Sequence, residues 1–244
     1  MSPRRPAPVQ NPPMYTLYIA NKNYSSWSLR PWVLLRTLAI PFEERLEPFT
    51  GATTAERFRS FSPSGRVPCL HDGATRVWDS LAIVEYLAER HPGVWPADPV
   101  ARAWARSAAA EMHAGFATLR NICSMTCGQR VRLRERPPAL ETDFVRLREL
   151  WHEGLRRFAG PWLAGSAFTA VDAFFAPVAF RLQTYGITLD PTSDAYAARL
   201  LLLPAMRDWY EAALIEPWRD DDHERDIVTV AAHIEDLRRT GSPT

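Results

Sequence analysis

The sequence contains only three cysteines, Cys69, Cys123 and Cys127, among its 244 residues. An odd and low number does not suit a disulfide-stabilised scaffold, so we expect a reducing compartment. Cys123 and Cys127 are four residues apart, which places them on one face if that segment is a helix. No second pair of cysteines or histidines completes the four ligands of a structural zinc site. We therefore expect a structural role for these thiols and no bound metal.

The sequence also lacks a large net charge, a long apolar run and a signal segment. Its 29 Lys and Arg residues balance 28 Asp and Glu residues, which gives a net charge of +1 and no argument for a nucleic-acid partner. No stretch approaches the about 18 apolar residues of a membrane helix. Residues 1–13, MSPRRPAPVQNPP, carry two arginines with no apolar run after them. We predict a disordered tail there, no membrane partner and a cytoplasmic location.

The first half of the chain alternates between strand-like and helix-like segments. Ser28 can cap the first helix, and Pro31 suits its first turn. The predicted elements are a strand over 15–20, a helix over 28–38, a strand over 42–47, a short helix over 53–60, strands over 67–71 and 76–78, and a helix from 80 to 91. Asp72-Gly73 joins the last two strands as a hairpin. The order β-α-β-α-β-β-α predicts a mixed sheet.

The second half reads as helix throughout. The prolines of Val94–Pro99 suggest a linker, and apolar residues then recur at helical spacing. The predicted helices cover 101–128, 141–163, a segment from about Thr169, 194–203 and 204–215, with a frayed tail after Asp220. Thr169 and Asp172 have the spacing of a capping box, which we interpret as structural.

Three motifs together suggest a family. They are Asn23–Arg30 (NYSSWSLR), Ser62–Pro68 (SPSGRVP) followed by Trp78–Leu87 (WDSLAIVEYL), and Gly165–Phe174 (GSAFTAVDAF). In this order and spacing they resemble the cytosolic glutathione transferases, over roughly residues 14–215. The resemblance implies an α/β thioredoxin-like glutathione-binding domain over 14–93. A linker over 94–100 and an all-α, electrophile-binding helical bundle over 101–244 would follow.

The resemblance also implies how glutathione is held. In that family the Val-Pro bond at the position of Val67-Pro68 is cis, and the turn exposes backbone groups to the cysteinyl part of glutathione. Arg66 lies beside this turn. Asp79 and Ser80 stand at a helix start, where free N–H groups and the helix dipole favour a carboxylate. Ser80 can take the γ-glutamyl carboxylate and Asp79 the ammonium, although Ser80 can also serve as an N-cap.

Serine-type members place one hydroxyl at the start of the first helix, where it donates to the glutathione sulfur. Ser25 and Ser26 both match such positions, and we favour Ser26. Zeta-like members have a cysteine where this chain has Trp27, which weakens the case for maleylacetoacetate isomerisation. The serines can also be simple caps and turn formers. Arg30 can stabilise the thiolate or pair with an acidic group, and the sequence does not separate the two roles.

In the helical half, one predicted helix face carries Arg106, His113, Arg120 and Ser124. The family's electrophile pocket borders this helix, although a solvated face has the same pattern. The residues we predict for that pocket are Trp27, His113, Arg120, Asn121 and Ser124.

The resemblance predicts a homodimeric glutathione transferase of serine type. Glutathione would be the co-substrate, and its thiolate would attack a small, hydrophobic electrophile. Two alternatives remain open from the sequence. One is a zeta-like isomerase that regenerates glutathione, and the other is a non-catalytic interaction module with the same fold.

Overall fold

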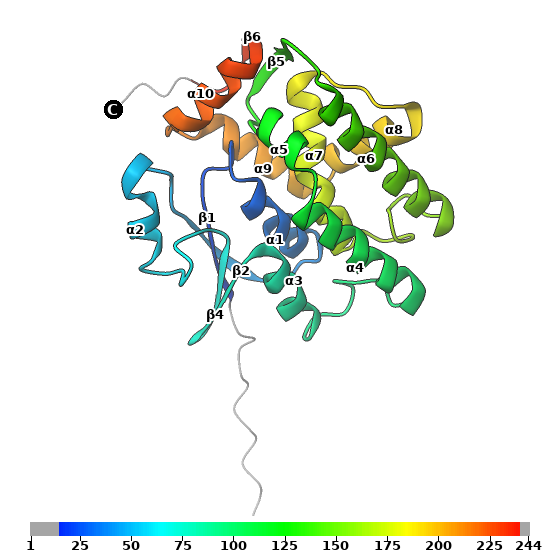
Figure 1. The fold of residues 1–244 in the computed structure, drawn as a ribbon. Helices are drawn as coiled ribbons and strands as arrows, with labels where there is room; N and C mark the ends of the chain where they lie inside the picture. The colour runs from blue at the N-terminus through cyan, green and yellow to red at the C-terminus, as the bar shows by residue number, and fades with distance from the viewer. Residues whose placement is uncertain (1–14, 240–244) are drawn as a thin grey trace, which may run out of the picture.

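A computed structural model describes residues 15–239, so the tail predicted over 1–13 lies outside the described residues. Figure 1 shows a small sheet with its helices, coloured blue to cyan, beside a larger group of helices, coloured green to red. Among the residues described, no helix is both long enough and apolar enough to cross a membrane.

The first part is a four-stranded mixed sheet with helices. Its elements are β1 (Tyr15–Ile19), α1 (Ser26–Thr37), β2 (Phe42–Leu46), the 3-10 turn η1 (Gly51–Thr53), α2 (Thr54–Phe58), β3 (Cys69–Asp72), β4 (Thr75–Trp78) and α3 (Ser80–Ala88). The strand order is β2-β1-β3-β4. Strands β1 and β2 are parallel, and the other two pairs are antiparallel. The predicted β-α-β-α-β-β-α order and mixed sheet are confirmed.

The second part is mainly helical. Its elements are α4 (Pro99–Ala114), α5 (Ala117–Ile122), β5 (Gln129–Leu133), α6 (Pro138–Arg157), α7 (Ala170–Tyr185), α8 (Pro191–Leu201), α9 (Pro204–Ile215), α10 (Asp221–Val230) and β6 (Ala231–Asp236). The predicted helical region is confirmed, but β5 and β6 form an additional antiparallel pair. The division into domains at a linker over 94–100 stays a prediction.

The helix predicted over 101–128 is broken in the structure. Helix α4 ends at Ala114, and Phe116 adopts a left-handed conformation with φ of 55° before α5 begins. A Cβ atom at Gly115 would lie 2.8 Å from the carbonyl oxygen of Glu111, so this close backbone approach suits only glycine. Because α5 ends at Ile122, Cys123 and Cys127 do not share a helix face, although both are buried.

The frayed tail predicted after Asp220 is also wrong. The Asp220 side chain accepts a hydrogen bond from the backbone N–H of His223 and caps α10. Strand β6 then pairs with β5, and the backbone N–H of Arg239 donates to the carbonyl of Leu214. The many acidic and basic residues suggested a frayed tail, but this segment is ordered because β6 pairs with β5, about 100 residues earlier in the chain.

The buried helix α7 holds the two parts together. Its side chains are buried nearly all round, which is the pattern of a helix inside a core. It packs against α1 of the sheet part and against α4 and α8 of the helical part. The carboxylate of Asp172 accepts the backbone N–H of Thr169 at 3.0 Å, which confirms the structural interpretation of that motif. Helix α7 therefore fixes the start of α1 against the helical region.

Candidate functional site

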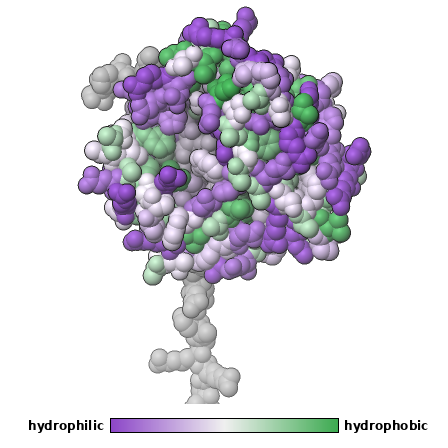
Figure 2. Space-filling view, in the orientation of Figure 1, coloured by the Kyte–Doolittle hydropathy of each residue, from purple (hydrophilic) through white to green (hydrophobic). Residues whose placement is uncertain are grey.

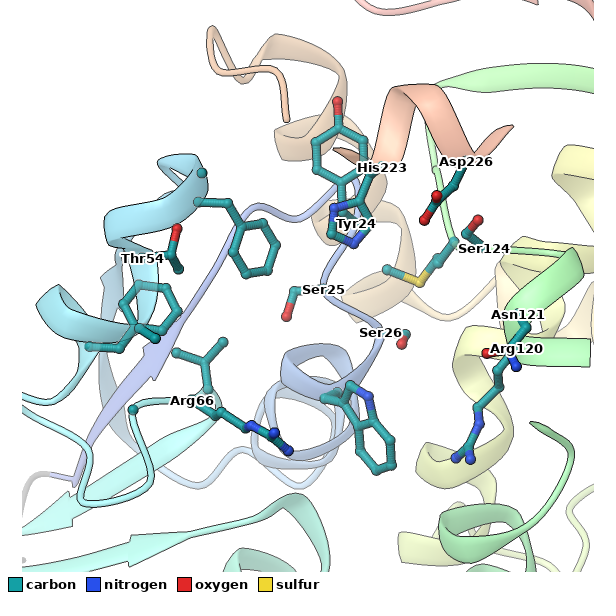
Figure 3. A pocket seen from close by; sticks show the side chains of 18 of the residues that line it. Tyr24, Ser25, Ser26, Thr54, Arg66, Arg120, Asn121, Ser124, His223 and Asp226 are labelled. Atoms are coloured by element: carbon teal, nitrogen blue, oxygen red, sulfur yellow. The ribbon is translucent and has the colours of Figure 1, made fainter. Parts of the chain in front are cut away.

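A cavity of about 920 Å³ lies between the two parts of the structure. Figure 2 shows this face of the molecule, with hydrophilic and hydrophobic residues intermixed around the hollow. Figure 3 places Ser25 and Ser26 in its middle, with Thr54 and Arg66 on one side and Arg120 and Ser124 on the other. The volume is in the range of about 300–1,000 Å³ that is usual for small-molecule sites.

Most of the residues predicted for glutathione and electrophile binding line this cavity. They are Ser25, Ser26, Trp27, Arg66, Val67, Arg120, Asn121 and Ser124. Pro68 is buried behind Val67, and the bond between them is cis, as predicted. Asp79, Ser80 and His113 do not line the cavity. Because the predicted helix is broken after Ala114, Arg106 and Arg120 do not lie on one helix face. Arg106 instead forms an ion pair with Glu85 at 2.9 Å.

The two serines differ in how their hydroxyl groups are used. Ser28, which the sequence suggested as the cap, lies inside α1, and α1 begins at Ser26. The hydroxyl of Ser25 donates to the Oγ of Ser28 at 2.7 Å. The Oγ of Ser26 accepts a hydrogen bond from Arg181 at 3.3 Å. The hydroxyl proton of Ser25 is therefore used in the hydrogen bond to Ser28, whereas the hydroxyl of Ser26 can still donate its proton to a ligand.

Arg181 is a cavity residue that the sequence analysis missed. It comes from the buried helix α7, lines the cavity and donates to the backbone carbonyls of Cys123 and Arg120. Its Nε atom is buried and has no partner among residues 15–239. Burial lowers the pKa of Arg181 to about 10, so the guanidinium is still charged at neutral pH. A single arginine in an apolar helix was the sequence signal that could have identified it.

Two more arginines, Arg30 and Arg120, lie near Arg181. Arg30 is buried, and its guanidinium lies over the ring of Trp27 at 4.2 Å. Burial and, to a smaller extent, the charges of Arg120 and Arg181 lower the pKa of Arg30 to about 9. Within the described part of the chain, none of the three forms an ion pair with a carboxylate. This cluster of positive charge favours an anion next to Ser26.

The start of α3 lies next to this arginine cluster. Asp79, not Ser80, is the N-cap, and its carboxylate accepts the backbone N–H of Leu81 at 2.8 Å. The Oγ of Ser80 lies 3.4 Å from a guanidinium nitrogen of Arg30, which donates to it. The Nε2 atom of His113 lies 3.6 Å from the carboxylate of Asp79. Burial lowers the pKa of His113, which favours its neutral form.

Helix α10 forms the opposite wall. His223, Asp226 and Thr229 line the cavity from this helix, and sequence analysis missed all three. The hydroxyl of Tyr24 donates to Glu224 at 2.5 Å, and Arg238 forms an ion pair with the same carboxylate. Burial and this hydrogen bond raise the pKa of Tyr24 well above its usual range. Tyr24 is thus a structural anchor for α10.

The described residues offer no cluster of three or more His, Cys, Asp or Glu side chains suited to a metal ion. Cys69, Cys123 and Cys127 are all buried and free. Burial raises the pKa of the Cys123 thiol to about 12, so this group is a thiol at neutral pH. The nucleophile of the site must come from a bound molecule or from another residue type.

Comparisons with known proteins identify similar chains. The model for the N-terminal domain of glutathione S-transferases matches residues 24–90. A maleylacetoacetate isomerase of Rattus norvegicus is 26% identical over 72% of this chain and 81% of its own length. A zeta class glutathione S-transferase of Euphorbia esula is 26% identical over 70% and 78%. In fold, the chain matches the glutathione-bound theta class glutathione S-transferase of Xanthomonas axonopodis pv. citri. That match has a TM-score of 0.60 and 24% identity over 81% of this chain and 97% of the other.

Proposed function

We propose that this chain, which is similar to glutathione transferases, binds glutathione and activates its thiolate for attack on a small electrophile. The observation that carries the proposal is the pair formed by Ser26 and Arg181. The Oγ of Ser26 accepts from Arg181 in the middle of the cavity, and its own O–H can donate to a sulfur anion.

Thiolate formation is the step that needs the protein. A free thiol has a pKa of about 8.5, and only the thiolate is a good nucleophile. Lowering that pKa by about two units requires about 2.7 kcal/mol of preferential stabilisation of the anion. Three features act in this direction: the hydroxyl of Ser26, the first N–H groups of α1, and the positive charge of Arg181 and Arg30.

The remaining contacts of glutathione follow from where the other predicted residues lie. Arg66 and Val67 line the cavity beside the serines, so the backbone of Val67 can pair with the cysteinyl part. Ser80 and Asp79 begin α3 beyond Trp27, where the γ-glutamyl end is expected to bind. Arg120, Asn121 and Ser124 face the serines across the cavity and would contact the electrophile.

Ser26→Ala is expected to reduce conjugation of an activated aryl chloride about 10- to 100-fold, because a hydrogen bond to an anion is lost. Ser25→Ala is the matched control, because its hydroxyl is bonded to Ser28 and it should retain activity within a few fold. Steady-state rates for both variants at saturating glutathione make the comparison. A larger loss in Ser25→Ala would reverse the assignment of the two serines.

A zeta-like isomerase is the second candidate function, favoured by the similarity to the rat maleylacetoacetate isomerase. Trp27 stands where the zeta-like pattern has cysteine, and its ring lies beneath the guanidinium of Arg30. Assaying maleylacetoacetate directly separates the two functions. Turnover of this substrate without consumption of glutathione would favour the isomerase. Failure to bind glutathione at all would favour a non-catalytic interaction module.

We further propose a cytoplasmic homodimer. Trp78 on the edge strand β4 is 44% exposed, and Val100 at the start of α4 is 54% exposed. We take both side chains as contacts of a second copy of the chain, because an interface removes exposed apolar surface from water. Sedimentation velocity of the wild type is expected to give the mass of two chains, and Trp78→Lys should shift the equilibrium toward one. A single-chain mass at all concentrations would contradict the dimer.

A further inference from the structure

Residues 21–25 form the serine turn, which joins β1 to α1, and all five of them are buried. Figure 3 shows Ser25 and Ser26 where this turn meets the start of α1, in the middle of the cavity. The amide oxygen of Asn21 accepts the backbone N–H of Phe49, which is a contact within the sheet part. The backbone groups of the next two residues bond instead to the helical part.

Glu216, the residue that ends α9, binds two consecutive backbone groups of the serine turn. Its carboxylate accepts the N–H of Lys22 at 2.6 Å and the N–H of Asn23 at 3.3 Å. A carboxylate has two acceptor oxygens, which suits two neighbouring N–H donors. The side chain is buried, and burying a carboxylate is costly unless it is hydrogen-bonded. Glu216 is therefore placed to fix the backbone of the turn.

Other groups of the helical part bond to the same two residues. The indole N–H of Trp209 on α9 donates to the carbonyl of Lys22 at 2.8 Å. The side-chain amide of Asn23 donates to the carbonyl of Ala213, also on α9, and accepts the N–H of Gly128 at 3.1 Å. The last turn of α9 and the segment before β5 thus hold the serine turn through backbone and side-chain groups together.

We propose that Glu216 is a positioning residue for thiolate activation, and that it acts by setting where the hydroxyl of Ser26 lies. This rests on the proposed function, because that hydroxyl must meet the sulfur of bound glutathione. Asn23 lies only three residues before Ser26, and the N–H of Ser26 bonds to the carbonyl of Tyr24 at 2.9 Å. A shift of the anchored residues therefore moves the serine. A misplacement of about 1 Å can cost about 100-fold in rate.

The contact between Ser26 and Arg181 depends on this anchor. Arg181 belongs to the helical part and Ser26 to the sheet part, so their distance of 3.3 Å is set by where the serine turn lies against the helices. Tyr24 also reaches the helical part, at Glu224, but only through its ring hydroxyl. Glu216 bonds to the backbone itself and so fixes the position of the turn more closely.

Glu216→Gln removes one acceptor and places an NH2 group against a backbone N–H. It is expected to raise the pKa of the bound glutathione thiol by about 1, which lowers the thiolate fraction and the rate with an aryl chloride about three- to fivefold at about pH 7. Glutathione affinity at about pH 5, where the thiol is protonated in both proteins, should stay within about threefold. Ultraviolet titration of bound glutathione and steady-state rates give these values.

Asp190→Asn is the matched control for this substitution. Asp190 also accepts two neighbouring backbone N–H groups, those of Thr192 and Ser193, but it caps α8 and does not line the cavity. This variant can lose stability, yet it should leave the thiol pKa and the rate unchanged. A thiol pKa that rises equally in both variants would contradict a specific role of Glu216.

A double variant separates positioning from general damage. If Glu216 acts through Ser26, Glu216→Gln should change the thiol pKa by less than about 0.3 when Ser26→Ala is already present. If the glutamine variant does not fold, Trp209→Phe removes one bond to the turn, keeps an aromatic ring and should give a smaller rise of the same sign. An unchanged thiol pKa in the folded variant, or an equal rise with and without the Ser26 hydroxyl, would overturn the role of Glu216. A wild type that binds no glutathione would overturn the proposed function itself.

Discussion

Arg181→Met is expected to lower kcat/KM for an aryl chloride by about 20-fold or more at about pH 7. Without this cation the bound thiol returns toward its free pKa of about 8.5, so that only about 3% is thiolate at that pH. Because the thiol ionises by itself in alkaline solution, the variant should recover most of its rate near pH 9. Rate measurements across this pH range, at saturating glutathione, give the comparison.

The alkaline recovery separates lost activation from a damaged fold. Arg181 also donates to the carbonyls of Cys123 and Arg120, and leaving them unpaired costs about 1–3 kcal/mol. A misfolded variant would stay inactive at every pH. Arg36→Met is the matched control, because Arg36 is exposed near the end of α1 and should change neither rate nor profile. A loss of rate in Arg181→Met that is the same at all pH values would contradict thiolate activation.

Asp172→Ala is expected to lower the free energy of unfolding by about 3 kcal/mol, a large part of the about 5–15 kcal/mol of a typical protein. The carboxylate of Asp172 accepts from the N–H of Leu163 at 3.0 Å, from the N–H of Thr169 at 3.0 Å, and from the hydroxyl of Tyr196 at 2.9 Å. Alanine leaves these three buried donors without an acceptor. Denaturant unfolding at constant pH measures the difference.

Asp194→Ala provides the comparison for this stability effect. Asp194 accepts one backbone N–H, that of Leu189 at 2.9 Å, and is half-buried. Its loss should cost about 1 kcal/mol or less. Equal losses for Asp172→Ala and Asp194→Ala would contradict the central position of the Asp172 carboxylate in the fold.

Asp172 also makes the free energy of unfolding depend on pH, with lower stability at higher pH. Burial raises its pKa from 3.8 to about 6 in the folded protein. The folded state therefore binds the proton more tightly than the unfolded state does. The contribution of this group to stability is fully present below about pH 4 and is lost as the pH rises through about 6. The alanine variant should lack this decline.

The glutathione half of the site was largely predictable because its residues are close in sequence. Ser25 and Ser26 directly precede the body of α1, and Val67-Pro68 directly precedes β3. Turn and helix-start patterns act over a few residues, and the motifs that carry the family resemblance are equally local. The sequence suggested Ser28 as the N-cap of α1, whereas Ser25 holds that position in the structure. The two could not be separated because both have side chains suited to an N-cap.

The other half of the site could not be predicted from local patterns. Arg181 reaches Ser26 across 155 positions of the sequence, and Arg238 reaches Tyr24 across 214. Helix α10 lies over the cavity because β6 pairs with β5, and neither strand has a strong local signal. Periodicity shows which side chains face a core but not which distant segment they meet. The single arginine within α7 was the signal closest to identifying this cavity residue.

The most direct test of thiolate activation is a pH titration of glutathione bound to the wild-type protein, followed by the ultraviolet absorbance of the thiolate. The position of Ser26 between the α1 N-terminus and Arg181 predicts that the bound thiol ionises with a pKa below about 7. Glutathione that binds and still ionises near about 8.5 would contradict the account.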